Sequence, residues 1–141
     1  MLSGRILAVK AFAIHFYARL AALMDKMNPD CVFCKIVAGN APAKILYTDS
    51  QVTAFRDLHP VAPTHILIVP NKHIASVNAL ESEDEPLVGH IISVARILAE
   101  REGIREGGYR IINNTGVHGG QTIFHMHFHL IGGQRMKHPM G

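Results

Sequence analysis

Cysteine is scarce in this chain, and its position limits what it can do. Only two of the 141 residues are cysteines, Cys31 and Cys34, and they lie too close together for a framework of loop-closing disulfides. Free thiols of this kind are typical of a reducing compartment. We therefore expect a cytoplasmic protein.

An excess of basic charge is absent from most of the chain, although the net charge is +3. Residues 1–29 hold four basic residues and one acidic residue, whereas residues 30–141 hold ten of each sign. A neutral body provides no basic stripe along which a phosphate backbone could lie. We therefore expect no nucleic-acid partner.

A long uninterrupted hydrophobic run is also missing. The N-terminal residues are rich in apolar side chains, but Arg5, Lys10, His15 and Arg19 interrupt them. A membrane-spanning helix needs about 18 or more consecutive apolar residues. The sequence therefore predicts no membrane span.

The N-terminal segment, residues 1–29, differs in composition from the rest. It has no acidic residue before Asp25, so it could be an organelle-targeting peptide or a weak signal sequence. It could equally be a flexible tail, or translation could begin at Met24 or Met27. An organelle location is the alternative to the cytoplasm if the segment is a targeting peptide.

Residues 30–141 have the composition of one globular domain. The whole chain is 48% hydrophobic and 18% charged, and it contains no internal repeat and no low-complexity tract. A chain of this length fits a single domain with a real core. We expect an N-terminal extension at residues 1–29 and one domain at residues 30–141.

The pattern of apolar residues predicts an α+β domain. Residues 33–39 form a short helix that Gly39 ends, and a longer amphipathic helix runs from an N-cap at Ser82, with Glu85 completing a capping box, to Gly103. β-Branched and alternating runs predict five strands, which form a mainly antiparallel sheet under the long helix. Their expected ranges are residues 44–49, 51–57, 64–70, 109–114 and 122–131.

The last expected strand carries three histidines at alternate positions. In a strand, alternate side chains share a face, so His125, His127 and His129 point to one side while Met126 and the other apolar residues point to the core. A solvated polar face would not need imidazole three times. The spacing alone leaves two chemical interpretations open, a metal site with three imidazoles or a nucleophile with flanking acid and charge-stabilising groups.

A glycine-rich loop precedes these histidines and favours phosphate chemistry. Asn114, Gly116, Gly119 and Gly120 supply backbone N–H groups that can approach phosphate oxygens closely. Side-chain donors follow directly, at Gln121 and Thr122. The sequence therefore predicts a phosphate cradle beside the imidazoles.

The run from His125 to Ile131, HMHFHLI, resembles the His-φ-His-φ-His-φ-φ signature of the histidine triad (HIT) superfamily. The similarity spans about residues 31–141, and it includes FCKIVAG, PAKILY, AFRDLHPVAPTHILIVPNKHI, YRIINN, GGQ and the terminal HPMG. The order of these segments resembles the Hint branch, the histidine triad nucleotide-binding proteins.

This resemblance implies a homodimeric hydrolase of purine nucleoside 5′-phosphoramidates and related nucleotidyl adducts. It implies that His127 attacks the α-phosphorus to give a nucleotidyl-histidine, while His125 and His129 assist and His65 supports the triad by hydrogen bonding. Neutral imidazole is a good nucleophile near neutral pH, which agrees with this assignment. His65 could instead be an ordinary hydrogen-bonded core histidine.

The resemblance also implies a set of nucleotide contacts. Asp57 corresponds to the carboxylate that binds the ribose hydroxyls, although it could merely end its strand. Phosphate-side contacts fall on Asn114, Gly120 and Thr122, with Gln121 beside them. The base pocket falls on three apolar residues that could also be plain core: Phe33, Ile36 and Leu67.

Some HIT proteins with a Cys-x-x-Cys motif bind structural zinc, and this resemblance implies a site at Cys31, Cys34, His73 and His125. Four such ligands close a tetrahedral site, so the metal would leave His127 free to react. The alternative is a pair of reduced cysteines that pack the first helix. No organic cofactor is expected.

Three other functions stay open at this point. A dinucleoside polyphosphate hydrolase is the nearest alternative within the superfamily. A nucleotide-binding, dimeric interaction module with little turnover would keep the same pocket. A metal-dependent hydrolase would use the three histidines directly as ligands, and chelators would inactivate it.

Overall fold

The computed structural model describes residues 27–137. Residues 1–26, which make up most of the expected N-terminal extension, lie outside the described range, so the role of that segment stays a prediction. Between residues 27 and 137, no helix is both long enough and apolar enough to cross a lipid bilayer.

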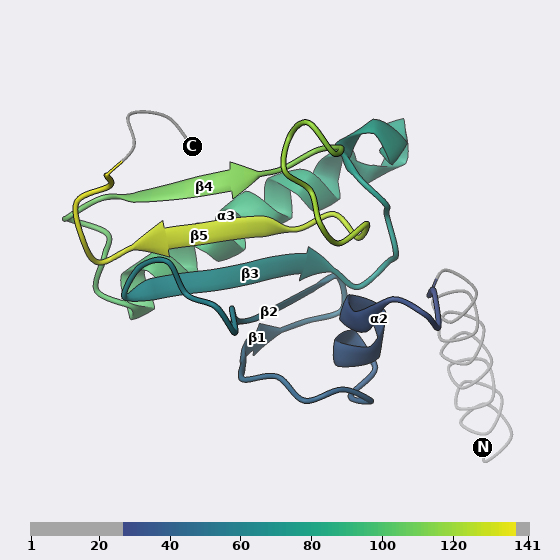
Figure 1. Cartoon of the computed structure of the whole chain (residues 1–141), viewed down its shortest axis with the longest axis horizontal. Coiled ribbons are helices and arrows are strands. Elements are labelled where there is room, and N and C mark those ends of the chain that lie inside the picture. Colours follow the sequence, from purple (N-terminus) through teal and green to yellow (C-terminus); the bar gives the residue numbers. More distant parts are fainter. Residues whose placement is uncertain (1–26, 138–141) are drawn as a thin grey trace, which may run out of the picture.

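Five strands of the described chain form one antiparallel sheet (Figure 1). Their order is β1-β2-β3-β5-β4, so β5 lies between β3 and β4. The expected α+β architecture is confirmed. The strands are β1 (Ile45–Thr48), β2 (Val52–Arg56), β3 (Thr64–Pro70), β4 (Tyr109–Asn113) and β5 (Phe128–Gly132).

Two α-helices of the described residues lie on opposite faces of this sheet. The long helix α3 (Glu85–Arg101) crosses one face, and the short helix α2 (Val32–Val37) packs near β2 and β3 on the other (Figure 1). Both helices end as the sequence predicts, because Gly39 and Gly103 adopt φ angles of 76° and 70° that favour glycine. Two short 3₁₀ segments, Val77–Ala79 and Ser82–Asp84, precede α3.

Alternation along the strands separates the core into two layers. Ile66 and Ile68 of β3 face α3, whereas Leu67 and Val69 face α2. The larger layer joins α3 to all five strands and contains Met126, Phe128 and Leu130, as the alternating pattern predicts. The residues between these three therefore lie on the α2 side of the sheet.

The predicted capping box at Ser82 and Glu85 is wrong by one position. Glu85 is the first residue of α3, and Ser82 already begins a 3₁₀ turn. The reciprocal contact is made by Asp84, whose Oδ2 accepts a hydrogen bond of 3.1 Å from the backbone N–H of Glu81. Lys72 lies 2.8 Å from Oδ1 of the same carboxylate and holds it in place.

The fifth strand is shorter than the sequence predicts, because it begins at Phe128 rather than near residue 122. Its pairing ends at Phe128, which lies opposite Ile68 of β3 and Asn113, the last residue of β4. Beyond that point β3 ends in Pro70, which has no N–H to donate. His125 and His127 therefore lie in an irregular segment just before the strand, and His129 lies within it.

Candidate active site and metal centre

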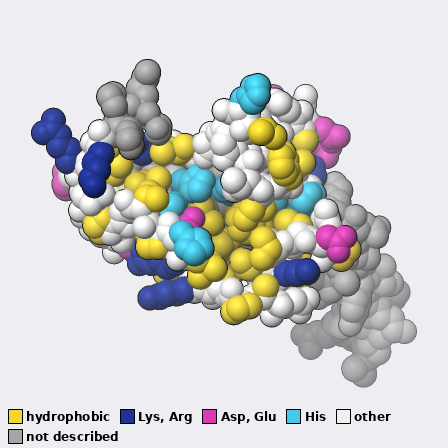
Figure 2. All heavy atoms as spheres, viewed as in Figure 1, with side chains coloured by type: hydrophobic (Ala, Val, Ile, Leu, Met, Phe, Trp, Pro, Cys, Tyr) yellow, Lys and Arg dark blue, Asp and Glu magenta, His cyan; other side chains and the backbone are white. Residues whose placement is uncertain are grey.

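Histidine side chains gather near the middle of the sheet face that α3 leaves free (Figure 2). Register explains the grouping, since His129 of β5 pairs with Leu67 of β3, and His65 of β3 pairs with Ile131 of β5. The ring centroids of His127 and His129 lie 5.0 Å apart, and those of His65 and His129 lie 5.1 Å apart. Three of the four predicted catalytic histidines thus form one contiguous group.

The hydrogen bonds of His127 define its tautomer. Its Nδ1 lies 2.7 Å from the backbone carbonyl oxygen of His125, which can only accept a hydrogen bond, so Nδ1 carries the proton. In a neutral ring Nε2 then holds the free lone pair. His127 is 5% exposed, and its ring makes a T-shaped contact with the ring of Phe33 at a centroid distance of 5.2 Å. The His127 ring is therefore held in one orientation, and Nε2 is the nitrogen that could act as a nucleophile in the neutral form.

A chain of hydrogen bonds also defines the tautomer of His129. The backbone N–H of Val61 donates to Nδ1 of His65 at 3.2 Å, so the proton of neutral His65 is on Nε2. That nitrogen lies 2.9 Å from Nδ1 of His129 and 3.4 Å from Oδ2 of Asp57. His65 donates to His129, which leaves the proton of His129 on Nε2. His129 can therefore donate a hydrogen bond to a substrate oxygen.

Burial favours the neutral forms of His65 and His129. It lowers the pKa of His129 to about 4, and the nearby His127 and His65 act in the same direction. Burial also lowers the pKa of His65, although the carboxylate of Asp57 opposes the shift. At neutral pH both rings are uncharged donors and acceptors rather than cations.

A cavity of about 460 Å³ opens between α2, β2 and β3, next to the histidines. Five predicted nucleotide-binding residues line it: Phe33, Ile36, Asp57, Leu67 and Thr122. Hydrophobic side chains lie beside histidines near the middle of the face shown in Figure 2. Phe33 and Leu67 reach both the cavity and the histidines, because Phe33 contacts His127 and Leu67 pairs with His129. The size suits a nucleoside-sized ligand.

The remaining predicted nucleotide contacts lie in the loop before the histidines, outside the walls of this cavity. Asn114 donates through Nδ2 to the backbone oxygen of Gly119 at 2.7 Å, and Gly120 has a φ of 80° that favours glycine. A side chain at Gly119 would collide with the backbone of Thr115, so the loop can close this tightly only with glycine there.

Gln121 is buried, and its amide is used within the protein. Oε1 accepts a bond of 2.9 Å from the backbone N–H of Gly116, and Nε2 donates to the carbonyl oxygens of Ala75 and Ile123 at 2.7 and 3.1 Å. The structure thus places Gln121 as a brace for the loop. Thr122, by contrast, is exposed at the cavity.

The predicted metal ligands Cys31, Cys34, His73 and His125 meet behind the histidine group. One potential ligand atom from each lies within 4.8 Å of the others. Nδ1 of His125 is 3.5 Å from both sulfur atoms, and Nδ1 of His73 is 3.4 Å from Sγ of Cys34. Both cysteines are free thiols. Two sulfur and two imidazole donors make the set that tetrahedral Zn²⁺ prefers.

The tautomer of His125 fits a metal at this cluster. Its Nε2 lies 2.8 Å from the carbonyl oxygen of Pro70, so Nε2 carries the proton and Nδ1 directs a lone pair towards the thiols. Burial lowers the pKa of His125 to about 4 and also lowers that of His73, so both are neutral ligands. Burial raises the pKa of Cys34, which a bound cation would offset.

A second group of potential ligands, Asp57, His65 and His129, fits a metal poorly. Nδ1 of His65 already accepts the N–H of Val61, so its Nε2 holds the proton of the neutral ring. A metal at Nε2 would require an imidazolate. The hydrogen-bond pattern therefore separates the two groups into a metal-type cluster and a catalytic-type cluster.

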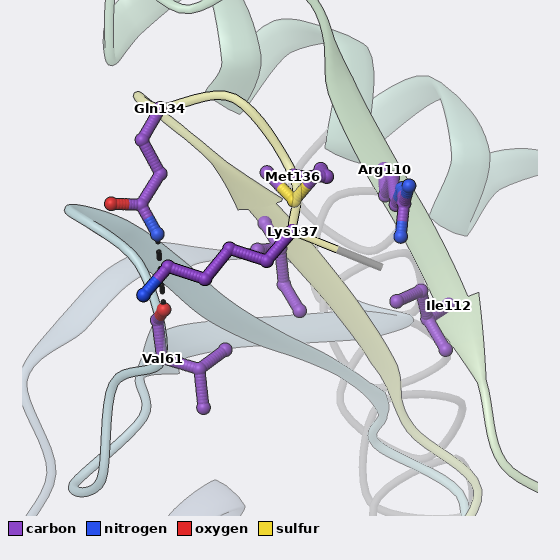
Figure 3. Close-up of a pocket in the computed structure, with 7 residues that line it drawn as sticks. Val61, Arg110, Ile112, Gln134, Met136 and Lys137 are labelled. Atoms are coloured by element: carbon purple, nitrogen blue, oxygen red, sulfur yellow. Dashed lines mark hydrogen bonds between the residues drawn. The ribbon is translucent and has the colours of Figure 1, made fainter. Parts of the chain in front are cut away.

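A second cavity, of about 200 Å³, lies over β4 and β5 beside the C-terminal segment (Figure 3). None of the predicted site residues lines it. Gln134 donates through Nε2 to the carbonyl oxygen of Val61 at 3.3 Å, as the dashed line in Figure 3 marks. Because the N–H of Val61 holds His65, this bond ties the C-terminal segment to the loop that orients His65.

Several residues of the site were not predicted from the sequence. Leu58 and His59 line the larger cavity, and the backbone N–H of His59 donates to Oδ1 of Asp57 at 2.7 Å. Asn113 donates a hydrogen bond to the carbonyl oxygen of His127, and Thr115 donates one to Asn113. Only the position of Leu58 and His59 directly after Asp57 could have suggested them, since no periodic pattern marks a loop.

Comparison with known proteins agrees with this geometry. Residues 30–141 match the family model described as scavenger mRNA decapping enzyme C-term binding. Purine nucleoside phosphoramidase of Escherichia coli K12 is 51% identical over 115 residues, which cover 82% of this chain and 93% of that protein. The chain belongs to the histidine triad family.

Solved structures of the same family share the fold. A HIT family hydrolase from Legionella pneumophila Philadelphia 1 is 46% identical with a TM-score of 0.77, and the match covers 79% of this chain and all (100%) of that one. A histidine triad protein from Clostridium difficile is 41% identical with a TM-score of 0.77, over 79% of this chain and 96% of that chain. By its family, the protein is therefore a hydrolase of the Hint type.

Proposed function

We propose that this protein hydrolyses purine nucleoside 5′-phosphoramidates through a covalent intermediate on His127. The observation that carries the proposal is the bond from Nδ1 of His127 to the carbonyl oxygen of His125, which leaves Nε2 unprotonated. The nucleoside-sized cavity adjoins this ring through Phe33. The activity named for the Escherichia coli relative supports the choice of substrate.

The nucleoside binds in the larger cavity. Phe33, Ile36 and Leu67 offer apolar surface to a purine base, and Asp57 accepts hydrogen bonds from the ribose hydroxyls. The N–H of His59 holds Oδ1 of Asp57 in place, so the carboxylate is oriented before the ligand arrives. An oriented acceptor loses little freedom when the ribose binds.

The α-phosphate lies between the histidines and the preceding loop. Thr122 offers its hydroxyl at the cavity, and Asn114 and Gly120 hold the loop that would close on the phosphate oxygens. Gln121 contributes by bracing that loop. Backbone and hydroxyl donors of this kind suit phosphate because they add no competing charge.

In the first step the lone pair of His127 Nε2 forms a bond to the α-phosphorus, and the bond from phosphorus to the amine nitrogen breaks. The amine leaves as it takes a proton from water. His129 donates a hydrogen bond from its Nε2–H to a phosphoryl oxygen, where negative charge develops, and it keeps that proton. His125 takes part through its backbone oxygen, which stabilises the positive charge on the His127 ring.

In the second step water attacks the same phosphorus and gives up one proton, which neutralises the hydroxide formed in the first step, and the bond to His127 breaks. The products are a nucleoside 5′-monophosphate and the free imidazole, which regains its lone pair at Nε2. The chain of Val61, His65 and His129 keeps its arrangement through both steps, because no member has to change its protonation state. Two easier steps thus replace one difficult displacement.

We also propose that Cys31, Cys34, His73 and His125 hold a structural Zn²⁺. When bound, the ion would crosslink the start of α2 to the segment before β5 and supply no reactive water, since all four positions are filled by protein. The donor set and the tautomer of His125 support this proposal. A catalytic metal at the triad is disfavoured by the hydrogen bonds of His65.

We also propose that the protein is a homodimer located in the cytoplasm. β4 is an edge strand whose five residues are all half-buried, and an edge strand left unpaired invites pairing with a second chain. Sedimentation of the purified protein tests the dimer. The two free thiols support a reducing compartment.

One comparison of substrates tests the activity. Adenosine 5′-phosphoramidate and a diadenosine polyphosphate are offered separately to the purified protein, and release of AMP is measured. We expect a higher kcat/KM for the phosphoramidate. A preference for the polyphosphate would support the dinucleoside polyphosphate hydrolase, and tight AMP binding without turnover of either would support the interaction module.

A further inference from the structure

The backbone of His127 is held by a side chain from the neighbouring strand. His127 precedes the first residue of β5, so it falls beyond the last pair of the β4–β5 ladder, Asn113 with Phe128. At this point Nδ2 of Asn113 donates a hydrogen bond of 2.8 Å to the carbonyl oxygen of His127. The side chain of Asn113 thus adds a rung where the backbone ladder has ended.

A second side chain orients the Asn113 amide. Oγ1 of Thr115 donates to Oδ1 of Asn113 at 2.8 Å, and because Oδ1 can only accept, the hydroxyl must be the donor. The opposite end of the amide then presents its N–H to His127. The direction of both bonds is therefore set by chemistry rather than by an arbitrary choice of amide orientation.

His127 is consequently fixed at two points. Its ring donates to His125 O, and its own carbonyl accepts from Asn113. Asn113 and Thr115 stand at the entrance to the loop that carries Asn114 and Gly120, the predicted phosphate contacts. The two bonds therefore link the position of the nucleophile to the loop that would hold its target.

We propose that Asn113 is a positioning residue for the nucleophile His127 and that Thr115 acts through Asn113. This inference rests on the proposed function, because it takes His127 as the nucleophile. An attack on phosphorus depends steeply on alignment, and a displacement of about 1 Å can cost about 100-fold in rate. Within the described residues, the bond from Asn113 is the only hydrogen bond that β4 makes to the His127 carbonyl. Without it, the irregular segment before β5 loses this support.

The test uses Asn113→Leu, which keeps the volume and removes the amide, and Thr115→Val, which keeps the shape and removes the hydroxyl. The matched control is Thr53→Val. The hydroxyl of Thr53 makes the same kind of bond, to Oδ1 of Asn71 at 2.7 Å, but in β2 and outside the site. Adenosine 5′-phosphoramidate hydrolysis and AMP binding are measured on each full-length protein.

We expect kcat of Asn113→Leu to fall by about 10- to 100-fold, with KM and the Kd for AMP within about twofold of wild type. Thr115→Val should lower kcat by a smaller factor, about 3- to 10-fold, because it only loosens the amide. Thr53→Val should lower Tm without changing kcat. A value of kcat within twofold of wild type in Asn113→Leu, or a loss of AMP binding that matches the loss of kcat, overturns the proposal.

A second measurement does not need turnover and so separates this inference from the proposed function. Long-range ¹H–¹⁵N spectra of the histidine rings report which nitrogen of His127 is protonated. The wild type should show one tautomer with the proton on Nδ1, and Asn113→Leu should show a mixture. Identical His127 spectra in the two proteins overturn the positioning role, whether or not the wild type hydrolyses phosphoramidates.

Discussion

Nδ1 of His127 lies 2.7 Å from the backbone oxygen of His125, two residues earlier in the chain. The side chain of His125 points away from this contact, with Nε2 on the carbonyl oxygen of Pro70 and Nδ1 facing Cys31 and Cys34. His125 thus orients the proposed nucleophile, His127, with its backbone and contributes its side chain to a metal-type cluster. The alternate histidines of the motif have different tasks for this reason.

The central histidine should be indispensable for turnover and dispensable for binding. Changing His127 to Asn removes the lone pair at Nε2 and leaves the cavity walls in place, so hydrolysis of adenosine 5′-phosphoramidate should fall by about 1,000-fold or more. AMP binding measured by calorimetry should change by less than about threefold.

The control for this variant is His90→Asn. His90 lies on α3, on the other face of the sheet, and its Nε2 contacts Oδ2 of Asp49 at 2.6 Å. It should lose stability and keep its kcat. Turnover of His127→Asn near the wild-type level would mean that another group attacks phosphorus.

Asp57 should discriminate ribose from deoxyribose. Loss of a hydrogen bond to a charged group typically costs about 1.5–3 kcal/mol, or about 10- to 150-fold in Kd. We therefore expect dAMP to bind the wild type more weakly than AMP, and Asp57→Ala to bind both nucleotides with similar, weak affinity. Calorimetry with the two nucleotides measures the difference.

Equal binding of AMP and dAMP by the wild type would show that Asp57 does not recognise the ribose 2′-hydroxyl. Its carboxylate, 3.4 Å from Nε2 of His65, would then serve mainly to hold that ring. Asp57→Asn provides the companion variant, because it preserves the shape and removes the charge.

Purified protein should carry about one zinc ion per chain, and the ion should stabilise the fold. A ligand that binds only the native state at about 1,000 times its Kd adds about 4 kcal/mol to the free energy of unfolding. Removal of zinc by a chelator should therefore lower Tm markedly. Hydrolysis measured well below Tm should fall much less, because the ion carries out no chemistry.

Cys31→Ser tests the same site without a chelator. It should lose zinc and stability together, whereas Cys34→Ser should lose more stability because Cys34 is only 1% exposed. Activity that disappears with zinc while Tm stays constant would favour the catalytic-metal alternative. Protein that binds no zinc would leave both cysteines as packing residues of α2.

The stability of the protein should decline with acid below the ordinary histidine range. Burial lowers the pKa of His129 from 6.5 to about 4, so between these pH values the unfolded chain binds a proton that the native state does not. The contribution of His129 to the free energy of unfolding is therefore fully present above pH 6.5, and it decreases as the pH falls towards 4. At 1.36 kcal/mol per pKa unit, the loss is at most about 3 kcal/mol.

Urea denaturation at several pH values measures this effect. His129→Gln should unfold with a shallower dependence on pH between 6.5 and 4 than the wild type, since glutamine does not titrate. Parallel curves for the two proteins would show that His129 is not held neutral by the fold.

Much of this fold could be predicted because its signals are local. The β-branched run at 64–70 is a fully buried strand, and the glycines at 39 and 103 end their helices through positive φ angles. The extent of β5 could not be predicted in the same way. It depends on where the pairing of β5 with β3 and β4 ends, and strand pairing is decided by residues distant in sequence.

The same distinction between local and long-range signals decides which parts of the site could be predicted. The histidine spacing predicted grouped imidazoles but left a metal site and a nucleophilic site both open, whereas Cys31, Cys34, His73 and His125 do meet as the resemblance implies. The roles of Gln121 and Asn113 could not be inferred, because each depends on which backbone atom its amide reaches in the folded chain. Asn113 is adjacent to the predicted Asn114, and only strand register shows that the two side chains have separate partners.

The most direct test of this account is mass spectrometry of the protein quenched with acid during turnover of adenosine 5′-phosphoramidate. Peptide mapping should find one nucleoside monophosphoryl group on the peptide that contains residues 125–129, with fragmentation placing it on His127. The modification should be absent from His127→Asn and should disappear from the wild type once the substrate is consumed. Active protein that shows no adduct at any time, or an adduct on a different residue, would contradict the mechanism.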